Sequence, residues 1–296
     1  MTRRTTVYLH PYRTVLLRWA IEADGPVCIG STEMGAVSPA TDQPSILADV
    51  LQELRDDGDV IDVVVHSSHT RFHRYPVEDD EPPEIRRTFE LQTCFPDLQS
   101  GHDLVLDVHL PGPVLSSSWH GVFVVPSPIV KFCNDIASGR QPTVCTLADA
   151  SAFQRYVLDS ASPAPSAMIG KRGQTWWTIV VDHLGALRHI GRTTSDQRLD
   201  PSVEIRDMLL DLHATMDLRV EHLVLFGDSL TKDVLDDTTT ATASLVQSVT
   251  RFVPFRLVRA DIDDDTARSL TKRAHILGPC LGVVLSTTEL VSRETA

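Results

Sequence analysis

The stretch SAMIGKRGQTWWTIVVDHLGALRHIG, from Ser166 to Gly191, decides the fold of this chain. It joins two apolar segments through a glycine-bearing turn that runs from Gly170 to Thr175. Two apolar runs separated by a short turn that contains glycine predict a β-hairpin. Glycine amides in such a turn can also cradle a phosphate group. The turn is therefore a candidate anion site as well as a structural one.

The start of the chain has a similar plan. Residues 5–34 predict a meander of three strands, with turns at Pro11-Tyr12 and at Asp24-Gly25-Pro26. Both halves then continue with alternating strands and helices, and a stretch of serine, alanine and proline from Ser160 to Ala167 joins them. A repeated plan with a loose joint predicts two mixed α/β lobes.

Periodicity places the remaining elements. Apolar residues at helical spacing predict helices, and unbroken apolar runs predict buried strands. The predicted helices cover residues 44–57, 82–95, 127–139, 201–216, 241–252 and 267–286, and the predicted strands cover residues 59–68, 102–112, 119–126, 221–227 and 255–261. Residues 143–160 predict a short strand that runs into a helix.

Composition excludes several classes of protein. The chain has 296 residues, 42% of them hydrophobic, and a net charge of -13, which opposes contact with a nucleic-acid backbone. Its five cysteines are scattered, which is typical of a reducing compartment and not of a disulfide framework. No apolar run is long enough to span a bilayer. We therefore expect a cytoplasmic protein that is not itself transmembrane and does not bind nucleic acid.

The order of the segments resembles the actin-like ATPase superfamily, and within it the PilM, FtsA and GspL branch of bacterial assembly proteins. The resemblance covers nearly the whole chain and is carried, in order, by VFVVPSPIVKFCNDI, TVCTLADASAFQRYV, IGKRGQTWWTIVV, VEHLVLFGDSL and LGPCLGVVLS. It implies a duplicated, ribonuclease H-like α/β fold with a first lobe over residues 1–160 and a second over 161–296. It also implies a small α+β subdomain inserted in the first lobe at about residues 40–130.

The same resemblance implies a nucleotide cleft between the lobes, where two loops with an aspartate and a glycine hold the phosphates and Mg²⁺. This chain departs from that pattern, because His10 and Pro11 occupy the first loop and Met168 stands in place of the second carboxylate. We therefore expect no catalytic residue, no metal and no required cofactor. Lys171 and Arg172 could still attract an anion, so ATP binding without hydrolysis stays open. The expected vestigial nucleotide site consists of Gly170, Lys171, Gly173, Thr175, Gly227 and Ser229.

Two function classes follow from this reading. The first is a non-catalytic scaffold that, as the resemblance implies, binds the cytoplasmic tail of a membrane-anchored assembly protein in type IV pilus assembly or type II secretion. Such a protein would lie at the inner membrane through its partner, and it could also self-associate. The second is an ATPase or a sugar-kinase-like phosphotransferase with an unconventional site. The missing carboxylates favour the scaffold, because phosphoryl transfer depends on positioned Mg²⁺.

Two polar clusters invite a metal hypothesis. His66, His69 and His73 are close in sequence, but an extended strand would turn His66 away from the other two. We therefore expect no metal site there. The acidic run from Asp261 to Asp265 lacks the glycine and the closing glutamate of a calcium loop. It is better interpreted as the acidic start of the helix that follows.

Two further features have competing interpretations. Ser229 follows a buried strand, but the motif of a serine hydrolase needs a second glycine where Thr231 stands, and the candidate base His275 lies in a helical run. We therefore do not expect a hydrolase. In the Trp176-Trp177 pair, strand alternation predicts one buried ring and one exposed ring, and an exposed ring beside Arg172 would suit a peptide partner.

Overall fold

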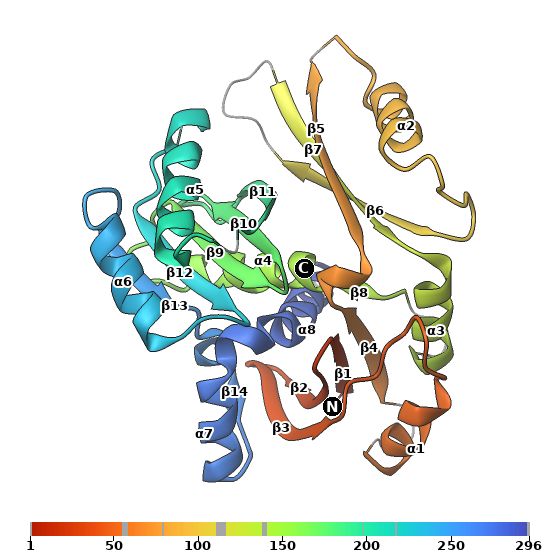
Figure 1. Cartoon of the computed structure of the whole chain (residues 1–296). Coiled ribbons are helices and arrows are strands. Elements are labelled where there is room, and N and C mark those ends of the chain that lie inside the picture. Colours follow the sequence, from red (N-terminus) through yellow and green to blue (C-terminus); the bar gives the residue numbers. More distant parts are fainter. Residues whose placement is uncertain are drawn as a thin grey trace.

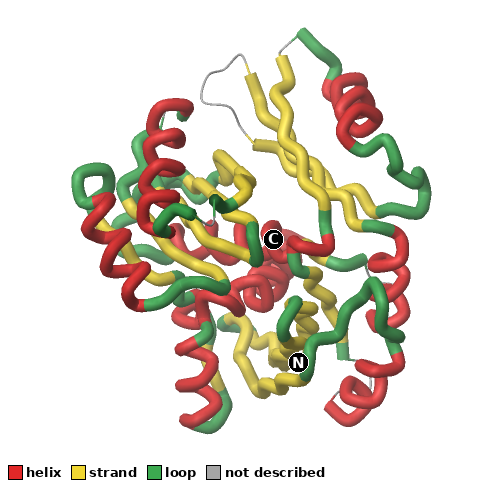
Figure 2. The backbone as a smooth tube through the Cα atoms, viewed as in Figure 1, coloured by secondary structure: helices red, strands yellow, loops and turns green. Residues whose placement is uncertain are grey.

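The computed structural model describes residues 2–54, 59–78, 80–110, 117–137, 141–196, 198–216 and 218–294. Figures 1 and 2 show two lobes side by side and an arm that extends from one of them. Within the described residues, none of the helices has both the length and the apolar character needed to cross a membrane.

The first lobe is built on a six-stranded sheet in the order β14-β3-β2-β1-β4-β8. Strands β1, β2 and β3 are antiparallel and form the predicted meander, whereas β4 pairs parallel with β1. The strand bounds are β1 Thr2–His10, β2 Arg13–Glu22, β3 Gly25–Met34, β4 Val60–Val65, β8 Thr143–Val144 and β14 Arg259–Ala260.

The second lobe repeats this arrangement in a five-stranded sheet with the order β11-β10-β9-β12-β13. Three antiparallel strands are again followed by strands that pair in parallel, which is the order β3-β2-β1-β4-β8 of the first lobe. The duplication predicted from the sequence is therefore confirmed. The bounds are β9 Ser166–Arg172, β10 Thr175–Val181, β11 Leu187–Thr194, β12 His222–Gly227 and β13 Ser248–Arg251.

Helices α4 and α8 pack against each other, and α8 contacts strands of both large sheets (Figure 1). Buried residues of α8 such as Leu277 and Leu281 form one hydrophobic cluster with Leu17 and Trp19 of β2. Burial of apolar surface thus joins the lobes around these two helices. The helices are α1 Ser45–Leu54, α2 Pro83–Cys94, α3 Ser127–Ala137, α4 Cys145–Leu158, α5 Pro201–Thr215, α6 Lys232–Thr242, α7 Asp264–Lys272 and α8 Ala274–Glu294, with short 3₁₀ turns η1 at Ser67–His69 and η2 at Pro254–Leu257.

The arm is a separate three-stranded sheet in the order β5-β7-β6, accompanied by α2 (Figure 1). Its strands are β5 Arg71–Glu78, β6 Leu104–Leu110 and β7 Ser117–Val125. The expected insertion at about residues 40–130 is thus too wide, because β4 belongs to the main sheet of the first lobe. The apolar run of β4 suits a strand in the interior of that sheet, where both faces are covered.

Two predicted elements near the C-terminus are wrong. The helix expected at residues 241–252 is replaced by the end of α6 and by β13, which pairs parallel with β12. The strand expected at residues 255–261 is mostly η2, and only two residues join the sheet as β14. At β13, tertiary pairing with β12 overrides the local helical propensity. The acidic start of α7 is confirmed, because the Asp263 carboxylate accepts hydrogen bonds from the amides of Asp265 and Thr266.

The two tryptophans of the hairpin are both buried, so the expectation of one exposed ring is wrong. Trp177 packs against Phe72 and Phe123 of the arm, with ring centroids 5.4 and 5.9 Å apart. Trp176 faces the other side, where its indole N–H donates to Glu204 in α5 at 2.9 Å. The two rings lie on opposite faces of β10, as strand alternation predicts, but the arm covers one face and α5 covers the other.

A second contact between the arm and the second lobe predicts a pH effect. Arg74 of β5 donates to Nδ1 of His189 in β11, and burial together with this guanidinium lowers the pKa of His189 to about 3. The other charged or titratable groups that line the same space are Arg188 and Arg192 of β11, Asp211 of α5 and His73 of β5. The unfolded chain therefore binds a proton at His189 below about pH 6.5 that the folded chain refuses.

Protonation of His189 in the unfolded chain should therefore lower the free energy of unfolding as the pH decreases, by about 2 kcal/mol between pH 6.5 and pH 4.5. We expect His189→Gln to flatten the pH profile of the unfolding free energy by this amount, as measured by urea denaturation at several pH values. Glutamine can still accept the hydrogen bond from Arg74, so the contact itself is kept. Parallel profiles for the two proteins would show that His189 is protonated in the folded state as well.

Candidate functional site

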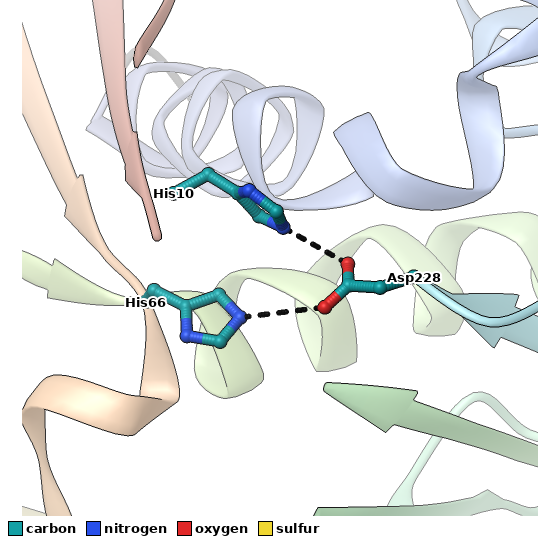
Figure 3. Close-up of side chains that lie close together, drawn as sticks. All are labelled: His10, His66 and Asp228. Atoms are coloured by element: carbon teal, nitrogen blue, oxygen red, sulfur yellow. Dashed lines mark hydrogen bonds and ion pairs between the residues drawn. The ribbon is translucent and has the colours of Figure 1, made fainter. Parts of the chain in front are cut away.

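Three polar side chains meet between the lobes, where the carboxyl ends of three strands converge (Figure 3). His10 ends β1, His66 directly follows β4, and Asp228 directly follows β12. The two histidines come from the first lobe and are buried, and the aspartate comes from the second lobe. The carboxyl ends of parallel strands are the usual place for ligand sites in α/β proteins. This cluster is therefore the candidate site.

Hydrogen bonds orient both imidazole rings toward the carboxylate. The amide of Tyr12 donates to Nδ1 of His10 at 3.3 Å, which leaves the proton of the neutral ring on Nε2. That Nε2 lies 2.9 Å from Oδ1 of Asp228. The amide of Ser68 donates to Nδ1 of His66 at 3.1 Å in the same way, but Nε2 of His66 stops 3.9 Å from Oδ2 of Asp228.

The Asp228 carboxylate also closes the glycine turn of the second lobe, because the amide of Gly173 donates to Oδ2 at 3.2 Å. Burial opposes ionisation of Asp228, but the hydrogen bond from His10 and the charge of Arg172 outweigh it and lower its pKa to about 2. The ionised Asp228 carboxylate therefore already accepts the hydrogen bond of the Gly173 amide, in the turn that was predicted to cradle a phosphate.

Beneath this cluster lies a fully buried ion pair. Arg172, the last residue of β9, donates from Nη2 to the Asp149 carboxylate of α4 at 2.6 Å, and both side chains are 0% exposed. Its Nη1 donates to the hydroxyl of Tyr8 in β1 at 2.9 Å. Burial disfavours the charged guanidinium, but the Asp149 carboxylate more than offsets it and raises the pKa of Arg172. The expectation that Arg172 is available to a bound anion is therefore wrong.

Solved structures with the same architecture identify the fold. A chain of the PilM-PilN type IV pilus biogenesis complex superposes with a TM-score of 0.69 at 11% identity, covering 96% of this chain and 98% of that one. A Bacteroides thetaiotaomicron protein described as having an actin-like ATPase fold and unknown function superposes with a TM-score of 0.55 at 12% identity, covering 91% of this chain and 96% of that one. The chain has the actin-like ATPase fold.

No family model and no curated protein matches the sequence. The fold implied by the order of the segments is therefore confirmed by structural comparison alone. The two turns that the resemblance implied as phosphate-binding loops lie between β1 and β2, just after His10, and between β9 and β10, at Gly173.

Three of the predicted nucleotide residues lie side by side where β9 pairs with β12. Gly170 is opposite Phe226, and Lys171 is opposite Gly227. A Cβ atom at Gly170 would stand 2.2 Å from the carbonyl oxygen of Phe226, and one at Gly227 would stand 2.2 Å from that of Lys171. Gly227 also has φ +98°, which favours glycine. Close strand contact explains both glycines without a ligand.

The other three predicted residues are Gly173, Thr175 and Ser229, which lie outside this strand contact. The Lys171 ammonium donates to Ser195 at 2.8 Å. Thr175 starts β10, and Ser229 lies exposed in the turn after Asp228. The hollow lined by both Lys171 and Ser229 has a volume of about 10 Å³. Small-molecule sites are typically about 300 Å³ or larger.

His66, His69 and His73 do not converge, as expected, but His66 belongs to the candidate site. His66 joins His10 and Asp228, whereas His69 lies in η1 and His73 bonds Glu90 of α2 at 2.8 Å. From the sequence, His10 was considered only as a missing aspartate and His66 only as one of three histidines that do not converge. The meeting of His10, His66 and Asp228 was not predicted, nor was the buried position of Asp149. One signal was available: each of His10, His66 and Asp228 stands at or just after the end of an apolar strand.

The serine hydrolase hypothesis also lacks its geometry. Nδ1 of His275, in the first turn of α8, lies 2.9 Å from the carbonyl oxygen of Gly227. That ring nitrogen is therefore engaged by the backbone. Since Ser229 is in an exposed turn, nothing in the described contacts joins it to a base.

Proposed function

We propose that the protein is a non-catalytic actin-like scaffold that binds a peptide segment of an assembly partner. The cleft between its lobes is closed by the chain's own side chains instead of by a nucleotide and Mg²⁺. The partner would be the cytoplasmic tail of a membrane-anchored protein of a pilus or secretion apparatus. The scaffold would then be cytoplasmic and held at the inner membrane only through that partner.

The observation that carries this proposal is the position of Asp228. Its carboxylate takes the Gly173 amide, and Arg172 is neutralised by Asp149. A triphosphate would have to displace an ionised carboxylate from a partly buried position, and no second carboxylate in this cluster could hold Mg²⁺. Phosphoryl transfer needs positioned metal and phosphates, so this arrangement favours a scaffold over an ATPase.

The partner hypothesis is supported by the PilM-PilN complex, whose PilM-like architecture extends over nearly all of this chain. Docking beside the arm, between the arm and the first lobe, is our proposal. A cleft of about 310 Å³ opens between the arm and the second lobe, and Arg74, Arg192 and Asp211 contribute to its lining. Arg74 donates to His189 and Arg192 stacks on Trp177, so the charged side chains of the lining leave a net positive charge. This cleft would suit an acidic partner segment.

Thermal stability in the presence of nucleotide tests the proposal. A ligand that binds only the folded state raises the melting temperature, by an amount that corresponds to about 2.7 kcal/mol at a hundred times Kd. We expect a melting temperature unchanged within error at millimolar Mg²⁺-ATP, and no phosphate release. Mg²⁺-ADP and Mg²⁺ alone serve as controls for ionic effects.

A clear shift with Mg²⁺-ATP together with hydrolysis would replace the scaffold by the phosphotransferase alternative. Binding assays with synthetic tails of membrane proteins encoded beside this one address the partner directly. We expect one such tail to bind the wild-type protein, and we expect the binding to be independent of ATP.

A further inference from the structure

The candidate site has the features of a metal centre that the sequence did not suggest. One ligand atom from each of His10, His66 and Asp228 lies within 4.8 Å of the others, and Figure 3 shows both rings pointing at the carboxylate. The three come from three strand ends, so their positions are fixed by the two large sheets. Ligands held by rigid elements are suited to bind a metal with little rearrangement.

His66 supplies an independent sign of a missing ligand. Its side chain is 0% exposed, and Nε2 has no hydrogen-bond partner among the described residues. A buried polar atom without a partner costs about 1–3 kcal/mol, so native structures rarely leave one. The nearest polar atom is Oδ2 of Asp228, which at 3.9 Å is too far for a hydrogen bond.

The spacing suits an ion between the side chains. Zn²⁺ binds imidazole nitrogen and carboxylate oxygen at about 2 Å, so two ligands of one ion lie about 3–4 Å apart. Nε2 of His10 lies 2.9 Å from Oδ1 of Asp228, and Nε2 of His66 lies 3.9 Å from Oδ2 of the same carboxylate. Small side-chain movements would bring all three within reach of one ion.

Metal binding at Nε2 would require both rings to change tautomer. When a metal occupies Nε2 of a neutral histidine, the proton lies on Nδ1 and needs an acceptor. At present each Nδ1 accepts a backbone amide, from Tyr12 for His10 and from Ser68 for His66. The Ser68 hydroxyl, 2.8 Å from Nδ1 of His66, can accept the proton once the Ser68 amide gives up its contact. The hydrogen bonds present are those of the metal-free form.

The ligand types select the class of ion. Two imidazoles and one carboxylate suit Zn²⁺ and neighbouring first-row metals, whereas Mg²⁺ prefers oxygen ligands. A neutral ring retains the lone pair that a metal needs.

We propose that His10, His66 and Asp228 together bind one divalent transition-metal ion, with Zn²⁺ as the ion their chemistry suits best, and that this ion ties the two lobes together. The inference does not depend on the proposed function, because a structural ion would be held whether or not a partner binds. It differs from the Mg²⁺ that accompanies a nucleotide in being bound by protein side chains alone.

The test uses the full chain, freed of metal with a chelator and titrated with Zn²⁺ by calorimetry, and with Co²⁺ by visible absorption. We expect one saturable site per chain and a rise in melting temperature with Zn²⁺. His66→Ala and the nearly isosteric Asp228→Asn should each weaken Zn²⁺ binding by about 100-fold or more. Circular dichroism checks that both variants are folded.

Two matched controls address the other groups in the described residues that could capture zinc. Cys94→Ser removes a ligand from the group formed by His73, Glu90 and Cys94, and His120→Ala breaks the exposed pair with His109. Both controls should keep the site. Absence of saturable binding to the wild-type chain would overturn the proposal, as would binding that survives in Asp228→Asn and disappears in Cys94→Ser.

Discussion

Replacing Arg172 with methionine is expected to lower the free energy of unfolding by about 3–5 kcal/mol. The substitution keeps most of the side-chain volume but leaves the Asp149 carboxylate buried without its partner. The hydroxyl of Tyr8 loses its hydrogen bond as well. Breaking a buried ion pair from one side is costly because the remaining charge has neither water nor a counter-ion. Urea denaturation followed by tryptophan fluorescence measures the change.

The double variant Arg172→Met with Asp149→Asn separates charge from packing. Without the orphaned carboxylate, we expect part of the loss to be recovered, so that the double variant is more stable than Arg172→Met alone. Arg192→Met, at an exposed position of β11, is the matched control and should change stability by less than about 0.5 kcal/mol. If Arg172→Met were as mild as Arg192→Met, the buried pair would not be holding the lobes together.

This pair also marks the limit of what could be predicted from the sequence. The hairpin at Ser166–Gly191 and the meander at residues 5–34 are local patterns, and both formed as expected. The strand runs around Val63 and Leu225 were found because unbroken apolar segments are read directly from the sequence. Their repeated order was enough to predict the duplicated fold.

The site was harder because its contacts join distant parts of the chain. Arg172 was expected to be open to an anion because it stands beside a turn. The packing of α4 and β1 around it makes it a buried partner of Asp149 instead. One ring of the tryptophan pair was expected to be exposed, because the arm that covers Trp177 is more than fifty residues away from it in the sequence. His10 and His66 carry no motif, since their meeting depends on the parallel pairing of β1 with β4. Long-range pairing of this kind is not contained in any local window.

Glycines of the second lobe could serve either phosphate binding or the close contact of two strands. The substitution Gly170→Ala distinguishes these two hypotheses. If Gly170 served a phosphate, alanine would affect ligand binding and leave the fold intact. The structure instead places its missing Cβ 2.2 Å from the carbonyl oxygen of Phe226, inside the ladder between β9 and β12. Backbone atoms at the centre of a sheet cannot move aside as a flexible side chain would. We therefore expect a loss of about 3 kcal/mol or more, measured by urea denaturation.

Gly173→Ala is the matched control, because Gly173 lies three residues along the same segment. Its φ is +61°, and nothing lies within 4 Å of an added Cβ. Only the left-handed backbone is then penalised, at about 1 kcal/mol. A Gly170→Ala protein as stable as Gly173→Ala would mean that β9 and β12 separate readily. The glycine would then need a ligand to explain it, and the nucleotide hypothesis would regain the support that strand pairing now removes.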